Sequence, residues 1–204
     1  MEPFHSTTQE RRRLSPEIRR EQIIDAAAVV LLDQGSLPLP PESLGRAAGV
    51  SKALIYAYFP TQYELLNTLL KREFDALVAA GISRAVRLAP LREAAIATAR
   101  IYFDRVAETG PIAHLILREH YMIGHVDLEN RRARNRIVLP LARAARRELL
   151  LKAKENIAAI NLVITIPEEA GRLAHVGEMS RDAARALCAR LVDSSLGALA
   201  PARR

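Results

Sequence analysis

Hydrophobic residues recur with the period of an α-helix along most of the chain, beginning near residue 16. Ile23, Ala27 and Leu31 fall on one face of a helix when successive residues turn by about 100°. Ser15 precedes a proline and a glutamate, which is typical of a helix start, and Gly35 suits the left-handed end of a helix. No alternating pattern typical of strands appears. The sequence therefore predicts an all-α protein whose first helix runs from about 16 to 34.

Further helices are predicted where the same period recurs between prolines, glycines and capping residues. Two short helices, at about 41–48 and 52–58, flank a turn at Gly49. Pro140 and Pro167 fall inside later predicted helices, so we expect a kink or a boundary at each. The six helices after the short pair are expected at about 61–82, 91–108, 111–123, 127–153, 155–176 and 181–199.

The pattern divides the chain into three segments. Residues 1–14 are polar, lack periodicity and contain Arg11-Arg12-Arg13, so we predict a flexible basic arm. Residues 15–60 form a first helical domain, and residues 61–204 form a second, larger one.

The composition indicates the cellular compartment of the protein. Half of the 204 residues are hydrophobic, which is enough for a substantial core, yet the longest clean apolar run is only residues 26–32. A membrane-spanning helix needs roughly 20 apolar residues, so we expect a cytoplasmic protein with no membrane partner. The single cysteine, Cys188, excludes an internal disulfide; we interpret it as a buried hydrophobe, with a redox sensor as the alternative.

The segment Leu44–Phe59, LGRAAGVSKALIYAYF, carries the functional signal. Two short helices around a glycine turn, preceded by a longer helix, have the layout of a three-helix DNA-binding unit. The second short helix would expose its first residues, and its free backbone N–H groups suit phosphate oxygens. Periodicity alone also fits proteins that do not bind DNA.

From Ile23 to Leu66 the chain closely resembles the TetR family of repressors. The matching residues are Ile23, Ala26-Ala27, Gly35, Ala48-Gly49-Val50-Ser51, Ile55-Tyr56, Tyr58-Phe59 and Glu64-Leu65-Leu66. The resemblance implies a helix-turn-helix domain at 15–60 and a ligand-binding and dimerisation domain at 61–204. It also implies a homodimer that represses at a palindromic double-stranded DNA operator and is released by a small-molecule effector.

Individual roles follow for the second short helix. Lys52 is the best candidate to read a base edge, most simply guanine, with a solvated lysine as the alternative. The resemblance gives Tyr58 a phosphate contact; Tyr56 either does the same or packs beneath the helix, and Ser51 caps the helix, binds phosphate or does both. Glu42 either accepts from a cytosine amine or remains solvated. The predicted DNA-contacting residues are Ser51, Lys52, Ala53, Leu54, Tyr56, Tyr58, Glu42, Gln62, Arg19 and Arg20.

The chain also departs from the family pattern. Leu39-Pro40 replaces a usual pair of hydroxyl residues, and Gln62 replaces a common lysine. We therefore expect fewer phosphate contacts from the motif itself, with Arg11–Arg13, Arg19 and Arg20 reaching the backbone or minor groove instead. The departures keep an alternative open, a helical small-molecule-binding or adaptor protein without specific DNA recognition.

The second domain has candidate residues for an effector and for a partner subunit. A pocket with apolar walls and few polar anchors suits a small molecule, and His114 and Arg118 share one helical face; they could equally be surface residues. The predicted ligand-binding residues are Tyr102, Phe103, His114, Arg118 and Met122. The predicted dimer residues, in the last two helices, are Ile160, Val163, Ile164, Leu187 and Leu191; an intramolecular core is the alternative.

The net charge of +7 comes almost entirely from residues 131–154, which carry nine basic residues and one acidic residue. This stripe is either a solvated face or a site for an anionic partner. No catalytic motif stands out, and His114, His120, His125 and His175 lack the spacing of a metal site. We therefore expect neither an enzyme nor a protein with a cofactor or metal.

Overall fold

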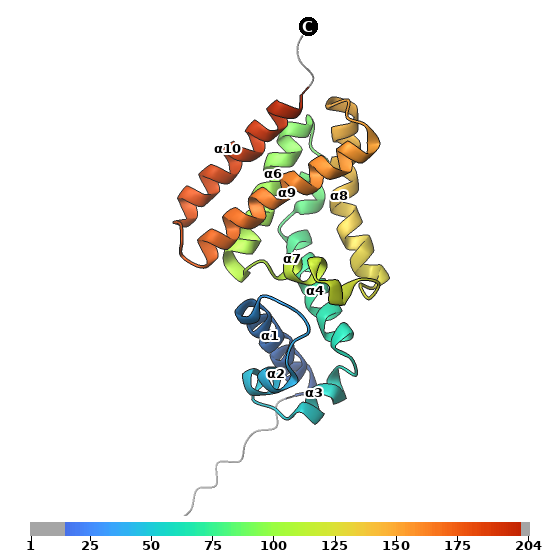
Figure 1. Ribbon diagram of the computed structural model, residues 1–204, viewed down its shortest axis with the longest axis vertical. Coiled ribbons are helices and arrows are strands. Elements are labelled where there is room, and N and C mark those ends of the chain that lie inside the picture. Colours follow the sequence, from blue (N-terminus) through green and yellow to red (C-terminus); the bar gives the residue numbers. More distant parts are fainter. Residues whose placement is uncertain (1–14, 201–204) are drawn as a thin grey trace, which may run out of the picture.

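Figure 1 shows the computed structural model, which describes residues 15–200 and consists of helices joined by loops over that range. The three N-terminal helices gather at one end of the molecule, and the fourth leads into a larger helical domain. The all-α prediction is confirmed. The helices are α1 (Pro16–Gln34), α2 (Pro41–Ala48), α3 (Lys52–Tyr58), α4 (Gln62–Ala79), α5 (Ile82–Ala85), α6 (Leu91–Thr109), α7 (Ile112–Arg118), the 3-10 turn η1 (His120–Met122), α8 (Leu128–Glu148), α9 (Ala153–His175) and α10 (Arg181–Leu199).

Local capping explains why the first helices match their predicted bounds. The hydroxyl of Ser15 accepts from the backbone N–H of Ile18 at 3.3 Å, and Gly35 ends α1 in the left-handed region at φ 69°. The hydroxyl of Ser51 accepts from the Leu54 N–H at 3.2 Å and starts α3 in the same way. Each cap satisfies backbone groups that a helix end leaves free.

The structure corrects the sequence prediction at three places. The helix expected at 61–82 ends at residue 79, because Gly81 takes φ 90° and starts the separate α5. The helix expected at 111–123 breaks at Glu119, whose extended backbone separates α7 from η1. The helix expected at 127–153 ends at Glu148. Helices α8 and α9 run through Pro140 and Pro167, so of the kink or boundary expected at each proline, neither is a boundary.

In the larger domain, α6, α9 and α10 pack against one another, and α8 covers the neighbouring side. Helices α6 and α9 approach closely at Gly171, where a Cβ atom would lie only 2.7 Å from the Cβ of Val106. Cys188 is buried on the inner face of α10. None of the helices between residues 15 and 200 is both long and apolar enough to cross a membrane.

Helix α4 belongs to both ends of the molecule. It packs on α1 below and on α6, α7 and α8 above, and its residues Leu66, Leu69 and Leu70 are completely buried. A displacement of α4 therefore disturbs contacts in both domains, which makes it the structural connection between them.

Candidate nucleic-acid interface and effector cavity

The turn between α2 and α3 is built on two glycines. Gly49 adopts φ 61°, and a Cβ atom at Gly45 would meet the backbone oxygen of Val50 at 3.0 Å. The Val50 N–H donates to the Gly45 carbonyl at 3.0 Å, which fixes the direction in which the chain enters α3. Because a side chain at Gly45 would push the turn outward, this glycine is needed for the close approach of the two helices.

Helix α3 buries one side and exposes the other. Ile55 is 4% exposed and packs into the core, whereas Tyr56 is 40% exposed. Ser51, Lys52 and Ala53 are exposed at the start of the helix. A seven-residue helix that presents small, cationic and phenolic groups on its open side has the shape and chemistry to enter a major groove.

The other predicted α3 residues divide by burial. Leu54 is exposed and offers only apolar contact, while Tyr58 is half-buried against the core. Lys52 lies 3.9 Å from the carboxylate of Glu42 on α2, and both side chains are largely exposed. Such a surface pair contributes little, so Lys52 can exchange Glu42 for another partner at small cost.

Gln62 does not face outward as a DNA contact. Its side-chain oxygen accepts from the Leu39 N–H at 2.8 Å, and its side-chain nitrogen donates to the Leu39 carbonyl at 2.7 Å. Both polar atoms are thus used to hold the α1–α2 loop on the start of α4. The prediction of a DNA contact is wrong, because the residue serves as an internal clamp between two backbone groups.

Arg19 and Arg20 also find partners inside the domain. Arg19 donates to the side-chain oxygen of Gln22 at 2.8 Å. Arg20 donates to Thr68 at 3.3 Å, and its guanidinium lies 4.8 Å from the centre of the Phe59 ring. Arg20 thus packs α1 against α4, whereas Arg19 bonds within α1; the DNA contact of these two arginines stays a prediction. The predicted basic arm, with Arg11–Arg13, lies outside the described residues.

The larger domain encloses a cavity of about 340 Å³ among α4, α6, α7, α8, α9 and α10. Its walls are mostly aliphatic, from residues such as Leu77, Leu141 and Ile160. A volume of this size with few polar groups is typical of a small-molecule site.

One polar cluster lies in the cavity wall. The phenol of Tyr102 donates to Glu168 Oε2 at 3.0 Å, and Nδ1 of His114 pairs with Glu168 Oε1. Burial, followed by the nearby Glu168 carboxylate, raises the pKa of Tyr102 well above its ordinary value, so this phenol remains a donor at neutral pH. Glu168 was not predicted, although an acid beside Pro167 in an apolar helix is a recognisable signal.

Three of the five predicted ligand residues, Tyr102, His114 and Arg118, lie in the cavity wall. Phe103 and Met122 do not, which corrects that part of the prediction. Both side chains are almost completely buried in the core, at 0% and 1% exposure. Phe103 follows Tyr102 directly and is therefore turned about 100° away from the face of α6 that meets the cavity.

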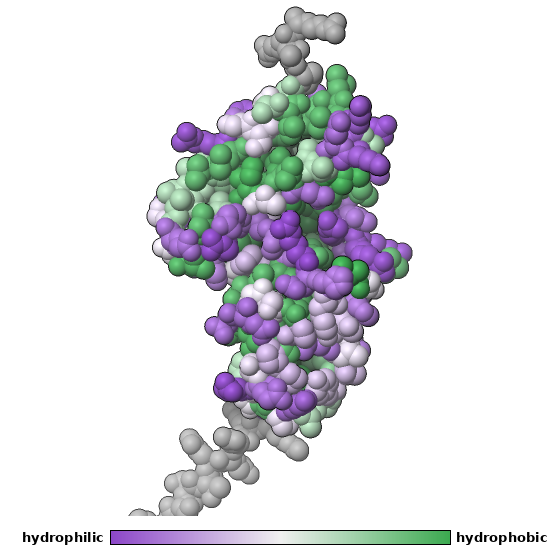
Figure 2. Space-filling model, in the orientation of Figure 1, coloured by the Kyte–Doolittle hydropathy of each residue, from purple (hydrophilic) through white to green (hydrophobic). Residues whose placement is uncertain are grey.

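The predicted dimer surface is partly wrong. Ile160, Val163 and Ile164 line the cavity, so their apolar stripe is used within the chain. Leu187 and Leu191 of α10 are 37% and 45% exposed. Hydrophobic side chains gather over the upper part of the molecule, where α9 and α10 reach the surface (Figure 2). The outward-facing leucines and isoleucine of the two helices are Ile157, Leu162, Leu187 and Leu191.

Helix α4 is fastened to the larger domain by buried polar contacts. Its Glu73 carboxylate receives two hydrogen bonds of 2.8 Å from the guanidinium of Arg105 on α6. Because such a two-pronged ion pair has a fixed geometry, α4 and α6 are held in one relative position.

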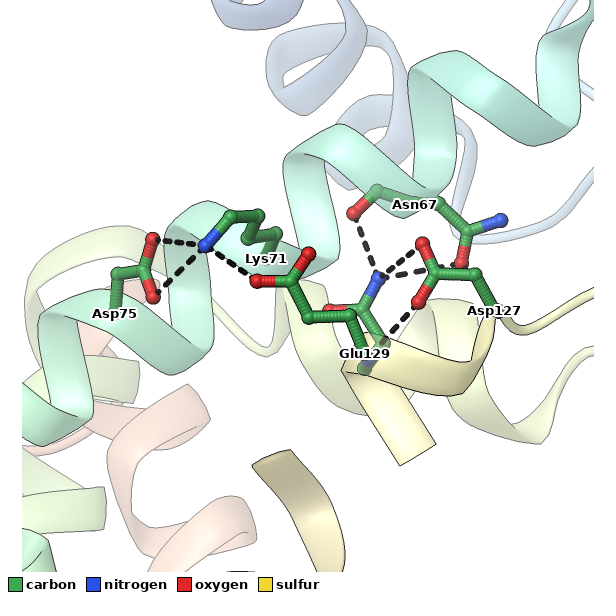
Figure 3. Close-up of polar contacts among 6 residues, drawn as sticks. Asn67, Lys71, Asp75, Asp127 and Glu129 are labelled. Carbon is green, nitrogen blue, oxygen red and sulfur yellow. Dashed lines mark hydrogen bonds and ion pairs between the residues drawn. The ribbon is translucent and has the colours of Figure 1, made fainter. Parts of the chain in front are cut away.

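A second set of polar contacts joins Asn67 and Lys71 of α4 to the loop before α8 and the start of α8 (Figure 3). The Asn67 amide donates to the His125 carbonyl at 2.9 Å and accepts from the Asp127 N–H at 3.0 Å. Lys71, one turn further along α4, pairs with Glu129 at 2.9 Å. The loop before α8 is therefore held on the N-terminal half of α4, the half nearer to α3.

Comparison with known proteins agrees with this arrangement. The family model described as bacterial regulatory proteins, tetR family, matches residues 23–69, which span most of α1 through the first part of α4. The transcriptional activator FasR of Mycolicibacterium smegmatis is 31% identical over 111 residues, covering 54% of this chain and 50% of FasR. The regulator BetI of Rhizobium meliloti is 33% identical over 86 residues, covering 42% of each chain. The chain thus matches about half the length of these curated relatives.

Solved structures extend the similarity of fold to nearly the whole chain. A TetR-like regulator from Rhodococcus sp. RHA1 has a TM-score of 0.64 at 21% identity, covering 91% of this chain and 97% of that one. FadR from Bacillus subtilis, in complex with stearoyl-CoA, has a TM-score of 0.61 at 18% identity, covering 90% and 99%. LfrR from Mycobacterium smegmatis, in complex with proflavine, has a TM-score of 0.56 at 23% identity, covering 91% and 99%. Residues 23–69 thus match the TetR family of bacterial regulatory proteins, and nearly the whole chain shares the fold of TetR-like structures.

Proposed function

We propose that this chain is a DNA-binding transcriptional regulator that represses at a palindromic operator as a homodimer and is released by a small molecule. The observation that carries the proposal is the exposed face of α3, held at a fixed angle by the Gly45–Gly49 turn. In this proposal the protein acts in the cytoplasm, where it meets its operator DNA. It is a regulator without a catalytic role.

The need for a dimer follows from DNA geometry. A palindrome presents two half-sites about 34–36 Å apart, or a multiple of that spacing, and a single α3 can occupy only one. The exposed apolar side chains of α9 and α10 offer a surface on which two copies can meet. That pairing places one α3 on each side of a two-fold axis.

The effector role rests on the cavity and its neighbours. The structural neighbours FadR and LfrR are solved in complex with stearoyl-CoA and proflavine. Here Phe74 and Leu77 of α4 form part of the cavity wall, so a ligand touches the helix that begins just after α3. Filling the cavity shifts α4 and changes the separation of the two α3 helices in the dimer.

Selection of bound duplexes from a random pool tests the proposal without assuming an operator sequence. The full chain should enrich a palindrome whose half-sites are about one DNA turn apart, and binding should weaken as salt rises. A control chain with Lys52→Ala and Tyr56→Ala should enrich no sequence. If the parent chain also enriches none, the helical adaptor without DNA recognition becomes the better description.

A further inference from the structure

The cavity is polar at one end and apolar at the other. On α6 its wall runs from Leu91 and Ala95 to Tyr102, and on α9 it runs from Ile160 and the uncharged Asn161 to the acidic Glu168. In each helix, the aliphatic end of the wall lies away from the DNA-binding domain. The walls formed by α6 and α9 therefore both become more polar toward the DNA-binding domain.

The third wall repeats this order. On α8 the wall begins at Arg134 and continues through Ile137 and Leu141. Arg118, at the end of α7, lines the same polar end as His114. A ligand complementary to these walls has a polar head toward the DNA-binding domain and an apolar tail toward α5 and the end of α10.

The length of the cavity fits an extended chain. Leu91 and Tyr102 are eleven residues apart in one helix, which places them about 16 Å apart along its axis. An extended chain advances roughly 1.2 Å per bond, so this distance accommodates about 13 bonds. The tail that fits is long and narrow, unlike a compact ring system.

The charge at the polar end identifies the head. Among residues 15–200 neither Arg118 nor Arg134 forms an ion pair, although both line the cavity. The one acid in the wall, Glu168, already has a partner on each oxygen, Tyr102 and His114. Two guanidinium groups without an ion-pair partner, beside a carboxylate whose two oxygens already have partners, favour an anion.

The position of Arg134 distinguishes it from the other arginines of α8. Arg132, Arg136, Arg143 and Arg147 are exposed on the face of the helix opposite to Ile137 and Leu141. Arg134 is exposed as well, but it is on the same side of the helix as these two buried residues, and it alone among the α8 arginines lines the cavity. The same helix therefore provides both a test residue and matched controls.

We infer that the effector is an unbranched acyl chain of about 10 to 14 carbons with an anionic head group held by Arg118 and Arg134. This inference rests on the proposed effector role of the cavity and specifies its chemistry. The head is the carboxylate of a free fatty acid, which a guanidinium binds in a two-pronged way.

Calorimetric titration of the full chain, below micelle-forming concentrations, separates head from tail. Dodecanoate should bind at least tenfold more tightly than 1-dodecanol, and dodecyltrimethylammonium should bind most weakly. Dodecanoyl-CoA has an uncharged thioester in place of the carboxylate and carries its phosphates beyond the pantetheine arm, so it should bind more weakly than dodecanoate; tighter binding would overturn the carboxylate head. In the fatty-acid series, affinity should rise up to about fourfold per CH2 group until the tail fills the cavity.

Two variants locate the ligand. Arg118→Gln with Arg134→Gln should weaken dodecanoate binding at least tenfold and leave 1-dodecanol binding unchanged, whereas the control Arg132→Gln should change neither. Ala95→Phe, which narrows the apolar end, should move the preferred chain length to shorter acids. Equal affinity for dodecanoate and dodecanol, or tightest binding of the cationic amphiphile, overturns the inference. DNA selection without any ligand tests the regulator itself, so the two failures can be told apart.

Discussion

Asn67 and Asn130 meet where α4 passes the start of α8, although 63 residues separate them in the sequence. The Asn130 side chain donates to the Asn67 backbone oxygen at 2.9 Å and to its side-chain oxygen at 3.2 Å. The side-chain oxygen of Asn67 also accepts from the Asp127 N–H in the loop before α8 (Figure 3). Both asparagines are buried, so this contact lies inside the connection between the two domains.

Asn67→Ala should destabilise the fold by about 1–3 kcal/mol, because it leaves buried backbone groups of the loop without partners. The same change should reduce the effect of ligand on DNA affinity, since α4 is then less firmly tied to α8. Denaturant unfolding measures the first effect, and DNA titration with and without ligand measures the second. Asn135→Ala, at an exposed position of α8, is the control and should change neither.

Gln62→Ala should lower stability by about 1–2 kcal/mol, because the Leu39 N–H and carbonyl both lose their partner. DNA affinity should fall only as far as the α1–α2 loop loosens. Its salt dependence should not change, since no phosphate contact is removed. A shallower dependence of log affinity on log salt concentration would show that Gln62 contacts DNA after all.

These contacts show which parts of the structure the sequence can predict. The bounds of α1, α2 and α3 follow from Gly35, Gly49, Ser51 and their neighbours, because caps act within a few residues. The end of α4 is also predictable in principle, from Gly81. The break at Glu119 has no such local signal and depends on packing across the domain.

The role of a side chain is harder to predict when its partner is distant in sequence. The partner of Gln62 lies 23 residues away, so periodicity could not identify the clamp. Likewise, the stripe Ile160–Ile164 is apolar whether it meets its own cavity or a second subunit. The sequence predicts that such residues are buried, and only the fold shows against what.

Leu162→Arg and Leu191→Arg should each convert the proposed dimer to monomers, because a charge in an apolar interface is costly. Leu162 is 70% exposed, so the chain itself should tolerate the substitution. Sedimentation at micromolar concentration checks the result. Leu150→Arg, at a residue 73% exposed in the loop between α8 and α9, is the control and should remain dimeric. A parent chain that sediments as a monomer would contradict the dimer.

Cys188 should be almost inert to alkylation in the folded protein. Burial raises the pKa of its thiol from 9.0 to about 11, and only the thiolate reacts. At pH 8, iodoacetamide should therefore react about 100-fold more slowly than with the chain unfolded in urea. Equal rates in the two conditions would show an accessible thiol.

The same pKa shift links Cys188 to stability at alkaline pH. The folded state holds the thiol proton of Cys188 more tightly than the unfolded chain does. The contribution of this thiol to the free energy of unfolding is therefore complete below about pH 9 and is lost as pH rises through about 11. Cys188→Ala should remove this part of the alkaline loss, which denaturant unfolding at pH 8 and pH 10.5 can measure.

If the exposed face of α3 reads DNA sequence, Lys52 should contribute to base preference. Fluorescence anisotropy on the selected palindrome and its single-base variants measures this, with the parent chain and Lys52→Ala compared at one salt concentration. Lys52→Ala should lose about 1–3 kcal/mol of binding free energy on the palindrome and discriminate less at one base position. Lys154→Ala, a change of equal charge on α9, should bind like the parent. A Lys52→Ala chain that keeps the parent's affinity and its base preferences would contradict the assignment of α3 as the recognition helix.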